Sequence, residues 1–455
     1  MRKNVVVIGS GPGGYVAAIR CAQRGMKVSI VEKGKIGGVC LNVGCIPTKA
    51  LFKNAAFIKD LKKSSSLGVD VNGYTIDFAK MMKRKDSIVK QLTTGVKQLL
   101  KKNGVEVIEG TAKIFDSNTV KVHTSYGDVV LSTDHIIIAT GSASITPPIP
   151  GIELDGVLSS EELLSQSVLP KSMAIIGGGV IGMEFASIYN IFGVDVTVIE
   201  KMPNILPSFD EEVTASLSEV LKERGVDIRV NTQLNSIKRH NGKLELSLGA
   251  QKLYVDTVLM SVGRRTVLPE LLNVDILIEN GSVVVNDYMQ SSIPNIYCIG
   301  DANGKMQLAH VASAEAIVAA DHISLGDGKK MSYKTNPSVV YTIPEIASVG
   351  LTEKEALNSG EIKTGRFKYG WNGKALCMDE TEGYMKVVSE TKYNEILGVH
   401  IFGYDASNLI AEAGLALGLE ATADEIAHTI HAHPTISEIF MECCEEIAFK
   451  SIHGF

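Results

Sequence analysis

Long hydrophobic runs are missing from this 455-residue sequence. No stretch approaches the roughly 18 consecutive apolar residues of a membrane-spanning helix, so no membrane association is expected. A signal peptide is missing too, because MRKNVVVIGS runs directly into a strand-like pattern. The sequence therefore predicts a protein of the cytoplasm.

A strong excess of charge of one sign is also absent. The formal net charge is −6, with 21% charged and 45% hydrophobic residues, which is ordinary for a globular protein and argues against nucleic acid as a partner. A basic run, KMMKRK at residues 80–85, is expected to form the solvated side of a helix. A chain of this length exceeds a single core, so several domains are expected.

Metal-ligand spacing is a third absence. The seven cysteines include no CxxC pair, and neither a second cysteine pair nor histidines follow at the spacing that a zinc site needs. Two of them instead form CxxxxC, with Cys40 and Cys45 in the glycine-rich segment GGVCLNVGCIPTK at residues 37–49. No metal site is expected, and this pair becomes the first candidate for chemistry.

On an undistorted helix, Cys40 and Cys45 would lie too far apart for a disulfide, whose Cα atoms approach within about 4.4–6.8 Å. The segment must bend if they are to meet, and Gly44 permits the backbone angles of a bend. Pro47 suits the first turn of a following helix, whose positive end stabilises a nearby thiolate. Two interpretations are open from this pattern alone: two buried apolar cysteines, or a reactive pair.

A nucleotide-binding pattern lies just before the cysteine pair. The strand-like run NVVVIG leads into GSGPGG and a helical pattern, with Gly9, Gly11 and Gly14 forming GxGxxG. Glu32 ends the next strand-like run. In a dinucleotide fingerprint the glycines allow close approach of a pyrophosphate, and the carboxylate binds a ribose hydroxyl. A dinucleotide is therefore expected beside the CxxxxC segment, which favours the reactive pair.

The same pattern recurs later, where residues 173–201 align without gaps on residues 5–33. The corresponding residues are Gly177, Gly179, Gly182 and Glu200. Two dinucleotides on one chain indicate a flavin and a nicotinamide, namely FAD and NAD. Glu200 favours a free 2′-hydroxyl and repels a 2′-phosphate, so NAD is expected rather than NADP.

The predicted fold class is α/β, with two duplicated Rossmann-like dinucleotide-binding domains and a C-terminal α+β interface domain. The expected domains are 1–148 for FAD, 149–270 for NAD, 271–335 completing the FAD-binding region, and 336–455 for the interface and dimerisation. Within the first domain, residues 52–103 have a helical pattern and residues 105–138 alternate as strands.

Three further residues stand at the ends of strand-like runs. Gly141 and Gly263 end the matching strands HIIIATGS and VLMSVGRR, and we assign them to the FAD and NAD sites respectively. Asp301 follows the strand-like run IPNIYCIG. It is either a ligand of the flavin ribityl chain or the N-cap of a helix.

The segment HAHPTISE at residues 431–438 supplies another reactive group. His433 precedes a proline at an expected helix start, and Glu438 is close enough in sequence to orient its imidazole. Such a histidine is a candidate general acid and base; the alternative is a helix-boundary histidine without chemistry. Cys443 and Cys444 follow on a helix and are interpreted as packing residues.

Together, GGVCLNVGCIPTK, both fingerprints and HAHPTISE resemble the class I pyridine nucleotide-disulfide oxidoreductase family, and within it the dihydrolipoamide dehydrogenases. The similarity covers the whole chain, and VVYTIPEIASVG, DETEGYMKVV and GLEATADEIAHTIHAHPTISE resemble that family's interface domain. Glutathione reductases, which are relatives, usually carry valine where this chain has Leu41 and Ile46.

The resemblance implies roles for the candidate residues. It pairs Cys40 and Cys45 as a redox-active disulfide, in which Cys40 exchanges with the substrate and Cys45 faces the flavin. It makes His433, oriented by Glu438, an acid and base that acts on the disulfide of the other subunit in a homodimer.

The same resemblance places Lys49 and Glu184 beside the flavin ring and favours the ribityl interpretation of Asp301. One departure is Ile343, where the family commonly has histidine; this position is expected to concern the interface. Mercuric reductases, also relatives, end in a paired-cysteine tail, which is a minor alternative for the two adjacent cysteines near the end of this chain.

The predicted activity is oxidation of dihydrolipoyl groups by NAD⁺. No lipoyl-bearing N-terminal extension is recognised, so the lipoyl arm is expected on another protein of a 2-oxoacid or acetoin dehydrogenase complex or a glycine cleavage system. Two alternatives are an NAD(P)H-dependent reductase of another low-molecular-weight disulfide, and a flavin redox sensor without turnover.

Overall fold

A computed structural model of the chain describes residues 3–454, and β-branched runs form the centre of its N-terminal unit. Five parallel strands make this sheet in the order β21-β7-β1-β2-β3. They are β21 (Ile296–Cys298), β7 (His135–Ile138), β1 (Asn4–Ile8), β2 (Lys27–Glu32) and β3 (Glu106–Glu109). The central strands are largely buried, as a parallel sheet covered on both faces requires.

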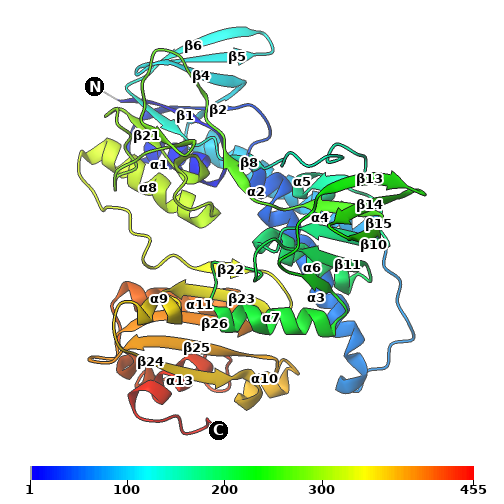
Figure 1. Cartoon of the computed structure of the whole chain (residues 1–455). Helices are drawn as coiled ribbons and strands as arrows, with labels where there is room; N and C mark the ends of the chain where they lie inside the picture. Colours follow the sequence, from blue (N-terminus) through cyan, green and yellow to red (C-terminus); the bar gives the residue numbers. More distant parts are fainter. Residues whose placement is uncertain (1–2, 455) are drawn as a thin grey trace.

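Helices and a second, smaller sheet complete this part of the chain (Figure 1). The helices are α1 (Pro12–Gln23), α2 (Gly38–Val43), α3 (Cys45–Lys62), α4 (Phe78–Lys102) and α8 (Ala309–Leu325), with short 3-10 turns at Ser64–Leu67 and Gly300–Asn303. The smaller sheet contains β18 (Glu270–Leu271), β4 (Thr111–Asp116), β5 (Thr119–Thr124) and β6 (Gly127–Ser132). A hairpin is formed by β19 (Ile278–Glu279) and β20 (Ser282–Val283). Strand β21 and helix α8 return to the first sheet from residues 271–335.

The second unit repeats the plan of the first. Its parallel sheet has the order β12-β11-β10-β16-β9. The strands are β12 (Asp227–Arg229), β11 (Asp195–Ile199), β10 (Ser172–Ile176), β16 (Thr257–Met260) and β9 (Val157–Ser159). Three helices, α5 (Ser160–Leu163), α6 (Val180–Ile191) and α7 (Glu211–Glu223), and an antiparallel sheet of β13 (Ser236–His240), β14 (Lys243–Leu248) and β15 (Gln251–Val255) complete it. Strands β8 (Ser142–Ser144) and β17 (Arg264–Thr266) pair with each other.

The C-terminal unit is built on an antiparallel sheet in the order β22-β23-β26-β25-β24 (Figure 1). Its strands are β22 (Ser338–Val340), β23 (Glu345–Gly350), β26 (Ile396–Gly403), β25 (Gly383–Glu390) and β24 (Ile362–Lys368). Its helices are α9 (Glu353–Leu357), α10 (Gly373–Cys377), α11 (Ala406–Gly418), α12 (Ala423–Ala427) and α13 (Glu438–Ala448), and a 3-10 turn spans Tyr369–Trp371. The predicted fold class is confirmed: two Rossmann-like units are joined to an α+β unit. The three boundaries between the predicted domains stay predictions.

The helical pattern expected over residues 52–103 is interrupted. Helix α3 ends at Lys62, and residues 68–77 form no helix or strand. Gly68 and Gly73 have φ values of 77° and 81°, which a helix cannot accommodate. Asp77 then caps α4 by accepting a hydrogen bond from the backbone N–H of Lys80.

The basic run at residues 80–85 is not fully solvated, so that expectation is wrong for Lys85. This side chain is buried, because α4 packs against the second unit. Its Nζ donates a hydrogen bond of 2.5 Å to the carbonyl of Leu164 and lies 2.9 Å from the carboxylate of Asp86. The carbonyl of Leu164 is free to accept because it stands at the C-terminal end of α5.

Ile343 is buried inside this chain rather than lying on an outer surface, so our expectation for this position is corrected. It packs in the apolar core that joins the second unit to the C-terminal sheet, together with Val340 and Ile346. Its backbone N–H donates a hydrogen bond of 3.0 Å to Ser187 Oγ on α6. The apolar side chain therefore suits the joint between units.

Across residues 3–454, no helix combines the length and the apolar character needed to cross a lipid bilayer.

Candidate active site

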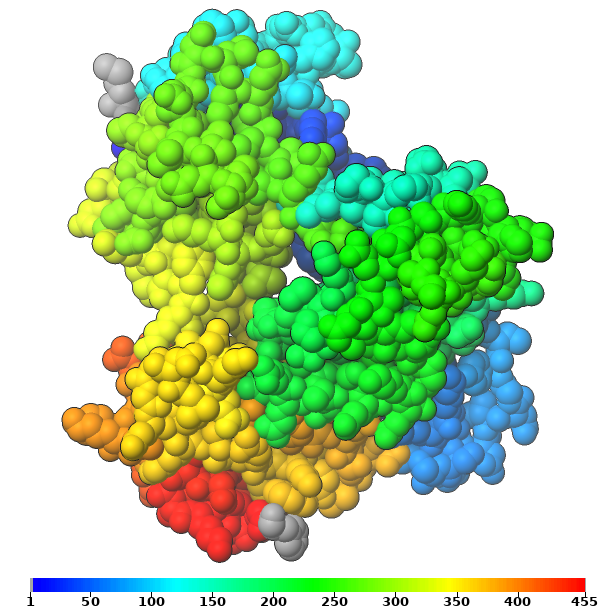
Figure 2. All heavy atoms as spheres, viewed as in Figure 1, coloured from blue at the N-terminus to red at the C-terminus, as the bar shows by residue number. Residues whose placement is uncertain are grey.

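One large cavity lies where the two nucleotide-binding units meet. Its volume is about 1880 Å³, and both glycine fingerprints and the CxxxxC segment line it. A pocket for a single small molecule usually has about 300–1,000 Å³. Figure 2 shows this face of the molecule hollowed between the two units. The space is large enough for two extended cofactors.

The first and third glycines of each fingerprint allow the strand, turn and helix to pack closely. Gly9 and Gly177 have φ values of 101° and 110°, in the region that favours glycine. A Cβ on Gly14 would lie 1.9 Å from the carbonyl oxygen of Gly9, and a Cβ on Gly182 would lie 2.0 Å from that of Gly177. Both repeats thus require glycine for the same reason.

The middle glycines have the opposite surroundings. Gly11 and Gly179 are the N-caps of α1 and α6, and no heavy atom lies within 4 Å of where a Cβ would stand on either. Both line the cavity. Each helix therefore opens with its unpaired N–H groups toward free space, which is the arrangement that binds a pyrophosphate. The fingerprint residues fit two dinucleotides.

Glu32 lies at the end of β2 with its carboxylate held by the phosphate-binding turn. Its Oε2 accepts hydrogen bonds from the N–H and Oγ of Ser10, at 2.8 and 2.6 Å. Its Oε1 accepts from the N–H of Gly34 at 2.7 Å. The carboxylate is therefore fixed at the wall of the cavity, where it can also accept from ribose hydroxyls.

Glu200 repeats this arrangement in the second unit. Its Oε2 accepts a hydrogen bond of 2.6 Å from the N–H of Gly178, and its Oε1 accepts one of 2.6 Å from the N–H of Met202. Because both oxygens accept from the backbone, the group presents negative charge to any ligand of the second fingerprint. A 2′-phosphate at this place would meet like charge.

Gly141 and Gly263 lie at matching strand ends and both line the cavity. Their φ values of 69° and 118° turn the chain out of β7 and β16. The backbone N–H of Val267 donates to the carbonyl of Gly141 at 3.0 Å, and the N–H of Ile145 donates to that of Gly263 at 3.0 Å. The two turns are therefore fastened to each other between the units.

The cysteine segment bends where the sequence predicts. Gly44, with φ of −139° and ψ of −113°, separates α2 from α3, so that Cys45 becomes the first residue of α3. The helix begins two residues before Pro47, slightly earlier than the proline suggests. A Cβ on Gly38 would lie 2.7 Å from the Cα of Gly11, so the redox segment packs directly on the phosphate-binding turn.

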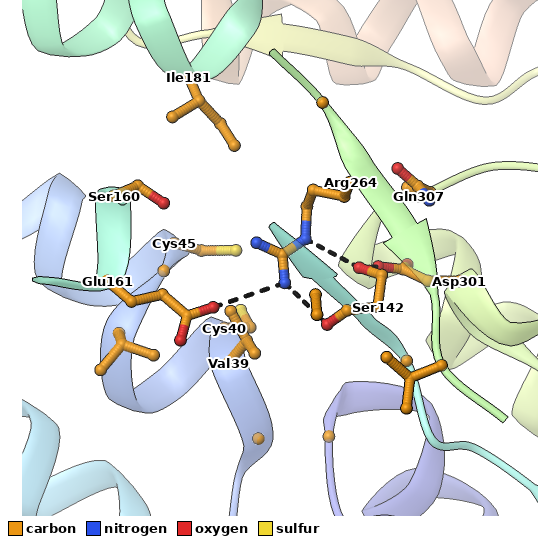
Figure 3. A pocket seen from close by; sticks show the side chains of 18 of the residues that line it. Val39, Cys40, Cys45, Ser142, Ser160, Glu161, Ile181, Arg264, Asp301 and Gln307 are labelled. Atoms are coloured by element: carbon orange, nitrogen blue, oxygen red, sulfur yellow. Dashed lines mark hydrogen bonds and ion pairs between the residues drawn. The ribbon is translucent and has the colours of Figure 1, made fainter. Parts of the chain in front are cut away.

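Cys40 and Cys45 face each other as free thiols joined by a hydrogen bond. Cys45 is exposed and Cys40 is partly exposed, and both line the cavity. The interpretation as two buried apolar cysteines is therefore wrong. Figure 3 shows Cys40 and Cys45 among the residues that line the cavity.

The electrostatics of the pair distinguish its two members. The hydrogen bond with Cys40, aided by the ammonium group of Lys49, lowers the pKa of Cys45 to about 7, although burial and Glu184 oppose this. The hydrogen bond with Cys45, and burial, raise the pKa of Cys40. Cys45 also stands at the positive end of α3. When the pair is reduced, Cys45 is therefore the thiolate and Cys40 its donor.

Lys49 and Glu184 form an ion pair whose charges both act on Cys45, and their place beside the flavin ring stays a prediction. The Nζ of Lys49 lies 2.8 and 2.9 Å from the two carboxylate oxygens of Glu184. Glu184 is buried and accepts another hydrogen bond, of 3.0 Å, from the N–H of Tyr341. Lys49 Nζ also lies 4.3 Å from the centroid of the Tyr341 ring. The C-terminal unit thus completes the surroundings of this pair.

We predict that Lys49→Met shifts the ionisation of Cys45 to higher pH. The change removes a cation that lowers the pKa of Cys45 and leaves Glu184, which raises it, so less thiolate exists at pH 7. Alkylation of Cys45 in the reduced protein by iodoacetamide, followed by mass spectrometry, should slow about tenfold at pH 7. Lys53→Met, at an exposed lysine on the same helix, is the control, and an equal rate in both variants would contradict the prediction.

His433 and Glu438 also form a pair. His433 Nδ1 lies 2.8 Å from Glu438 Oε1, and Oε2 of the same carboxylate accepts a hydrogen bond of 2.7 Å from the N–H of Thr435. Partial burial opposes the effect, but these hydrogen bonds keep the pKa of Glu438 below its usual range. The imidazole is 79% exposed. Helix α13 begins at Glu438, so His433 lies in the preceding loop and not at the helix start.

The structure does not bring His433 to the cysteine pair of its own chain. Neither His433 nor Glu438 is among the described residues, 3–454, that line the cavity. Cys443 and Cys444, farther along α13, are fully buried in the core of the C-terminal unit. The packing interpretation of these two cysteines is confirmed, and a reactive cysteine tail like that of mercuric reductases is wrong.

Asp301 lies in the 3-10 turn Gly300–Asn303 at the end of β21 and lines the cavity. The interpretation as a helix N-cap is wrong, because Leu308 is the N-cap of α8. Its carboxylate Oδ2 accepts a hydrogen bond of 2.5 Å from Ser142 Oγ. Asp301 is therefore placed to bind a ligand in the first unit.

Two residues, one lining the cavity and one buried behind it, were not predicted from the sequence. Arg264, on β17, donates a hydrogen bond to Ser142. In the sequence, only its place in the segment VGRR, directly after the strand-like run that ends at Gly263, could have pointed to this residue. Glu315 is fully buried on α8 and accepts hydrogen bonds of 2.6 Å from the N–H of Gly300 and from the hydroxyl of Tyr333. Its signal was a single carboxylate in the apolar run AHVASAEAIVAA.

Comparison with known proteins agrees with this geometry. Residues 3–316 match the family model of pyridine nucleotide-disulphide oxidoreductases, and residues 336–444 match the dimerisation domain of that family. A dihydrolipoyl dehydrogenase of Bacillus subtilis is 39% identical, with 99% of both chains covered. One of Geobacillus stearothermophilus is 41% identical, with 98% of this chain and 97% of that chain covered.

Solved structures give the same result. The HOCl-induced flavoprotein disulfide reductase RclA from Escherichia coli superposes with a TM-score of 0.90 at 28% identity, covering 98% of this chain and 100% of that one. LpdA from Mycobacterium tuberculosis, at 24% identity and a TM-score of 0.90 over 98% of this chain and 99% of that chain, shares the fold. The resemblance and the FAD and NAD cofactors predicted from the motifs are confirmed. The chain belongs to the pyridine nucleotide-disulphide oxidoreductase family.

Proposed function

We propose that this protein oxidises dihydrolipoyl groups with NAD⁺. Its relatives from Bacillus subtilis and Geobacillus stearothermophilus are named dihydrolipoyl dehydrogenases. One observation carries the proposal. Cys45, with a pKa of about 7, lies beside Cys40 in a cavity that the two dinucleotide fingerprints share. A dithiol and two cofactor sites in one cavity provide a route for an electron pair.

The chain's own residues account for the thiol half of the reaction. With the pair oxidised, a substrate thiolate attacks Cys40 Sγ, which breaks the Cys40–Cys45 bond and forms a mixed disulfide. The second substrate thiol then displaces Cys40, so the lipoyl ring closes and two cysteine thiols result. Cys45 is a good leaving group because Lys49 and the start of α3 stabilise its thiolate.

Residues of the two units hold the cofactors that complete the reaction. Gly11, Glu32 and Asp301 hold FAD, and Gly179 and Glu200 hold NAD. FAD bound there would supply two-electron redox chemistry between the cysteine pair and the nicotinamide. The ion pair of Lys49 with Glu184 holds the ammonium group in place near Cys45 Sγ.

A homodimer supplies the missing acid and base in this proposal. His433 is 79% exposed on the C-terminal unit, and Ile430 and Leu419 of the same unit are 97% and 73% exposed. Apolar side chains exposed to this degree favour a surface that a second protein subunit covers. His433 of a second subunit then accepts protons from the substrate thiols at Cys40, with Glu438 holding its imidazole.

We further propose a lipoyl-bearing protein of a multienzyme complex as the partner, because the reaction needs a lipoyl arm from another chain. The compartment proposed is the cytoplasm. Four of the seven cysteines, namely Cys21, Cys298, Cys443 and Cys444, are buried free thiols, as expected of a reducing compartment.

The likeness to RclA favours a second candidate, a reductase of another disulfide. Steady-state turnover decides between them. Oxidation of free dihydrolipoamide with NAD⁺ that exceeds reduction of glutathione disulfide with NADPH supports the proposal. The reverse order supports the second candidate, and no turnover with either substrate supports a redox sensor.

The choice of nicotinamide gives a separate prediction. Because Glu200 presents negative charge at the second fingerprint, kcat/KM should favour NADH over NADPH by about 100-fold. Glu200→Gln should narrow this ratio about tenfold, since it removes the repulsion of a 2′-phosphate. Glu219→Gln, at an exposed carboxylate on α7, should leave the ratio unchanged. A ratio that Glu200→Gln leaves intact would show that another group selects the cofactor.

A further inference from the structure

Three side chains from distant parts of the sequence form a line across the cavity wall. Figure 3 shows Arg264, Ser142 and Asp301 joined by hydrogen bonds, with Glu161 on the far side of Arg264. We propose that Arg264 is a positioning residue for FAD, which acts through Ser142 on the carboxylate of Asp301. This inference rests on the proposed function, in which Asp301 holds FAD.

The directions of the hydrogen bonds support this role. A guanidinium group can only donate, so Arg264 Nε donates to Ser142 Oγ at 2.8 Å. The single proton of that hydroxyl is then free to point to Asp301 Oδ2, at 2.5 Å. Among residues 3–454 no protein donor bonds to Asp301 Oδ1. The line therefore fixes one carboxylate oxygen and leaves the other for a hydroxyl of the ligand.

Arg264 is itself held firmly. Its Nη2 donates to the backbone carbonyl of Ser142 at 2.8 Å, and its side chain is only 14% exposed. Nη2 also lies 3.6 Å from Glu161 Oε1, on α5 of the second unit. Two contacts to one serine and an ion pair across the units leave the guanidinium little freedom to rotate.

The same strand also fixes the backbone of the acidic residue. Thr266, two residues after Arg264 on β17, donates its hydroxyl proton to the carbonyl of Asp301 at 3.0 Å. Strand β17 thus determines both where the main chain of Asp301 lies and which way its carboxylate points. Without Arg264, the Ser142 hydroxyl loses its only charged donor, and the carboxylate loses a defined orientation for the ligand.

The test measures how tightly the purified holoprotein holds FAD. Ser142→Ala, Arg264→Gln and the double variant are compared by the dissociation constant for FAD, followed through flavin fluorescence and the visible absorbance of the bound flavin. Each single change should weaken FAD binding by about 10-fold or more. Because the two residues act in series, the double variant should bind FAD no more weakly than Arg264→Gln alone.

Arg265→Gln is the matched control. This neighbouring arginine on β17 is exposed, so its replacement should leave FAD binding unchanged. If Arg264→Gln fails to fold, as thermal unfolding would reveal, Ser142→Ala alone decides, since it removes a single oxygen atom.

Two results would overturn this inference alone. One is FAD binding in Ser142→Ala equal to that in the control. The other is a double variant in which the fold-losses of FAD affinity of the two single variants multiply. A chain that bound no FAD in its unchanged form would overturn this inference and the proposed function together. If the unchanged protein binds FAD and the variants show the expected affinities, but the unchanged protein does not turn over dihydrolipoamide, only the proposed substrate is overturned.

Discussion

Cys45→Ser is expected to lower dihydrolipoamide oxidation by at least about 10³-fold while FAD stays bound. A serine oxygen cannot form the disulfide with Cys40, and it carries no negative charge near pH 7. The thiolate leaving group that Lys49 and the start of α3 stabilise is therefore missing from the variant. Binding of FAD should persist, because the residues of the first fingerprint and Asp301 are unchanged.

The measurement is steady-state turnover of free dihydrolipoamide with NAD⁺, together with the flavin absorbance of the purified variant. Cys377→Ser is the matched control, because Cys377 is exposed on α10 and does not line the cavity. It should keep full turnover. Appreciable lipoamide turnover in Cys45→Ser would remove the dithiol from the mechanism.

The fingerprints could be predicted because their constraints are local. Gly14 is required by its own turn, where a Cβ would meet the carbonyl oxygen of Gly9, and Gly182 repeats this with Gly177. The bend at Gly44 follows in the same way, since two cysteines can meet there only if the helix is broken. Spacing alone therefore determines these features, and the duplicated pattern makes each half support the other.

Long-range contacts could not be predicted in this way. Ser142 and Arg264 are 122 positions apart in the sequence, and only the pairing of β8 with β17 brings them together. Lys85 has the composition of a solvated lysine, yet its Nζ meets a carbonyl at the end of a helix in another unit. Burial of a charged group depends on its partner, which no local pattern contains.

The proposed acid and base pair combines a local contact that the sequence predicts with a long-range one that it does not. The pairing of His433 with Glu438 is local and could be predicted, and the structure places them 2.8 Å apart. Their relation to the cysteines is not local, because within the described chain they do not line the cavity. A single chain, in sequence or in structure, therefore contains both halves of the proposed site without joining them.

His433→Gln is expected to lower kcat/KM for dihydrolipoamide by about 10²–10⁴-fold, because the substrate thiol then lacks its proton acceptor. Glu438→Gln should have a smaller effect in the same direction, since it only weakens the orientation of the imidazole. His123→Gln is a close control: His123 Nδ1 also lies 2.8 Å from a carboxylate, that of Asp128, and is similarly exposed, yet it lies on β5 outside the cavity. Turnover should be unchanged in that variant.

Mixed dimers test whether the acid and base come from the second subunit. In a dimer of one Cys45→Ser chain and one His433→Gln chain, one site carries both changes and the other carries neither, provided that each site combines cysteines and histidine from different chains. Co-expression with two affinity tags should therefore restore about half of the unchanged turnover per purified mixed dimer, although each parent retains about a hundredth of that turnover or less. If cysteines and histidine of the same chain worked together, both sites of the mixed dimer would carry one change and no activity would return. Recovery is thus possible only when the exposed His433 reaches the cavity of the other subunit.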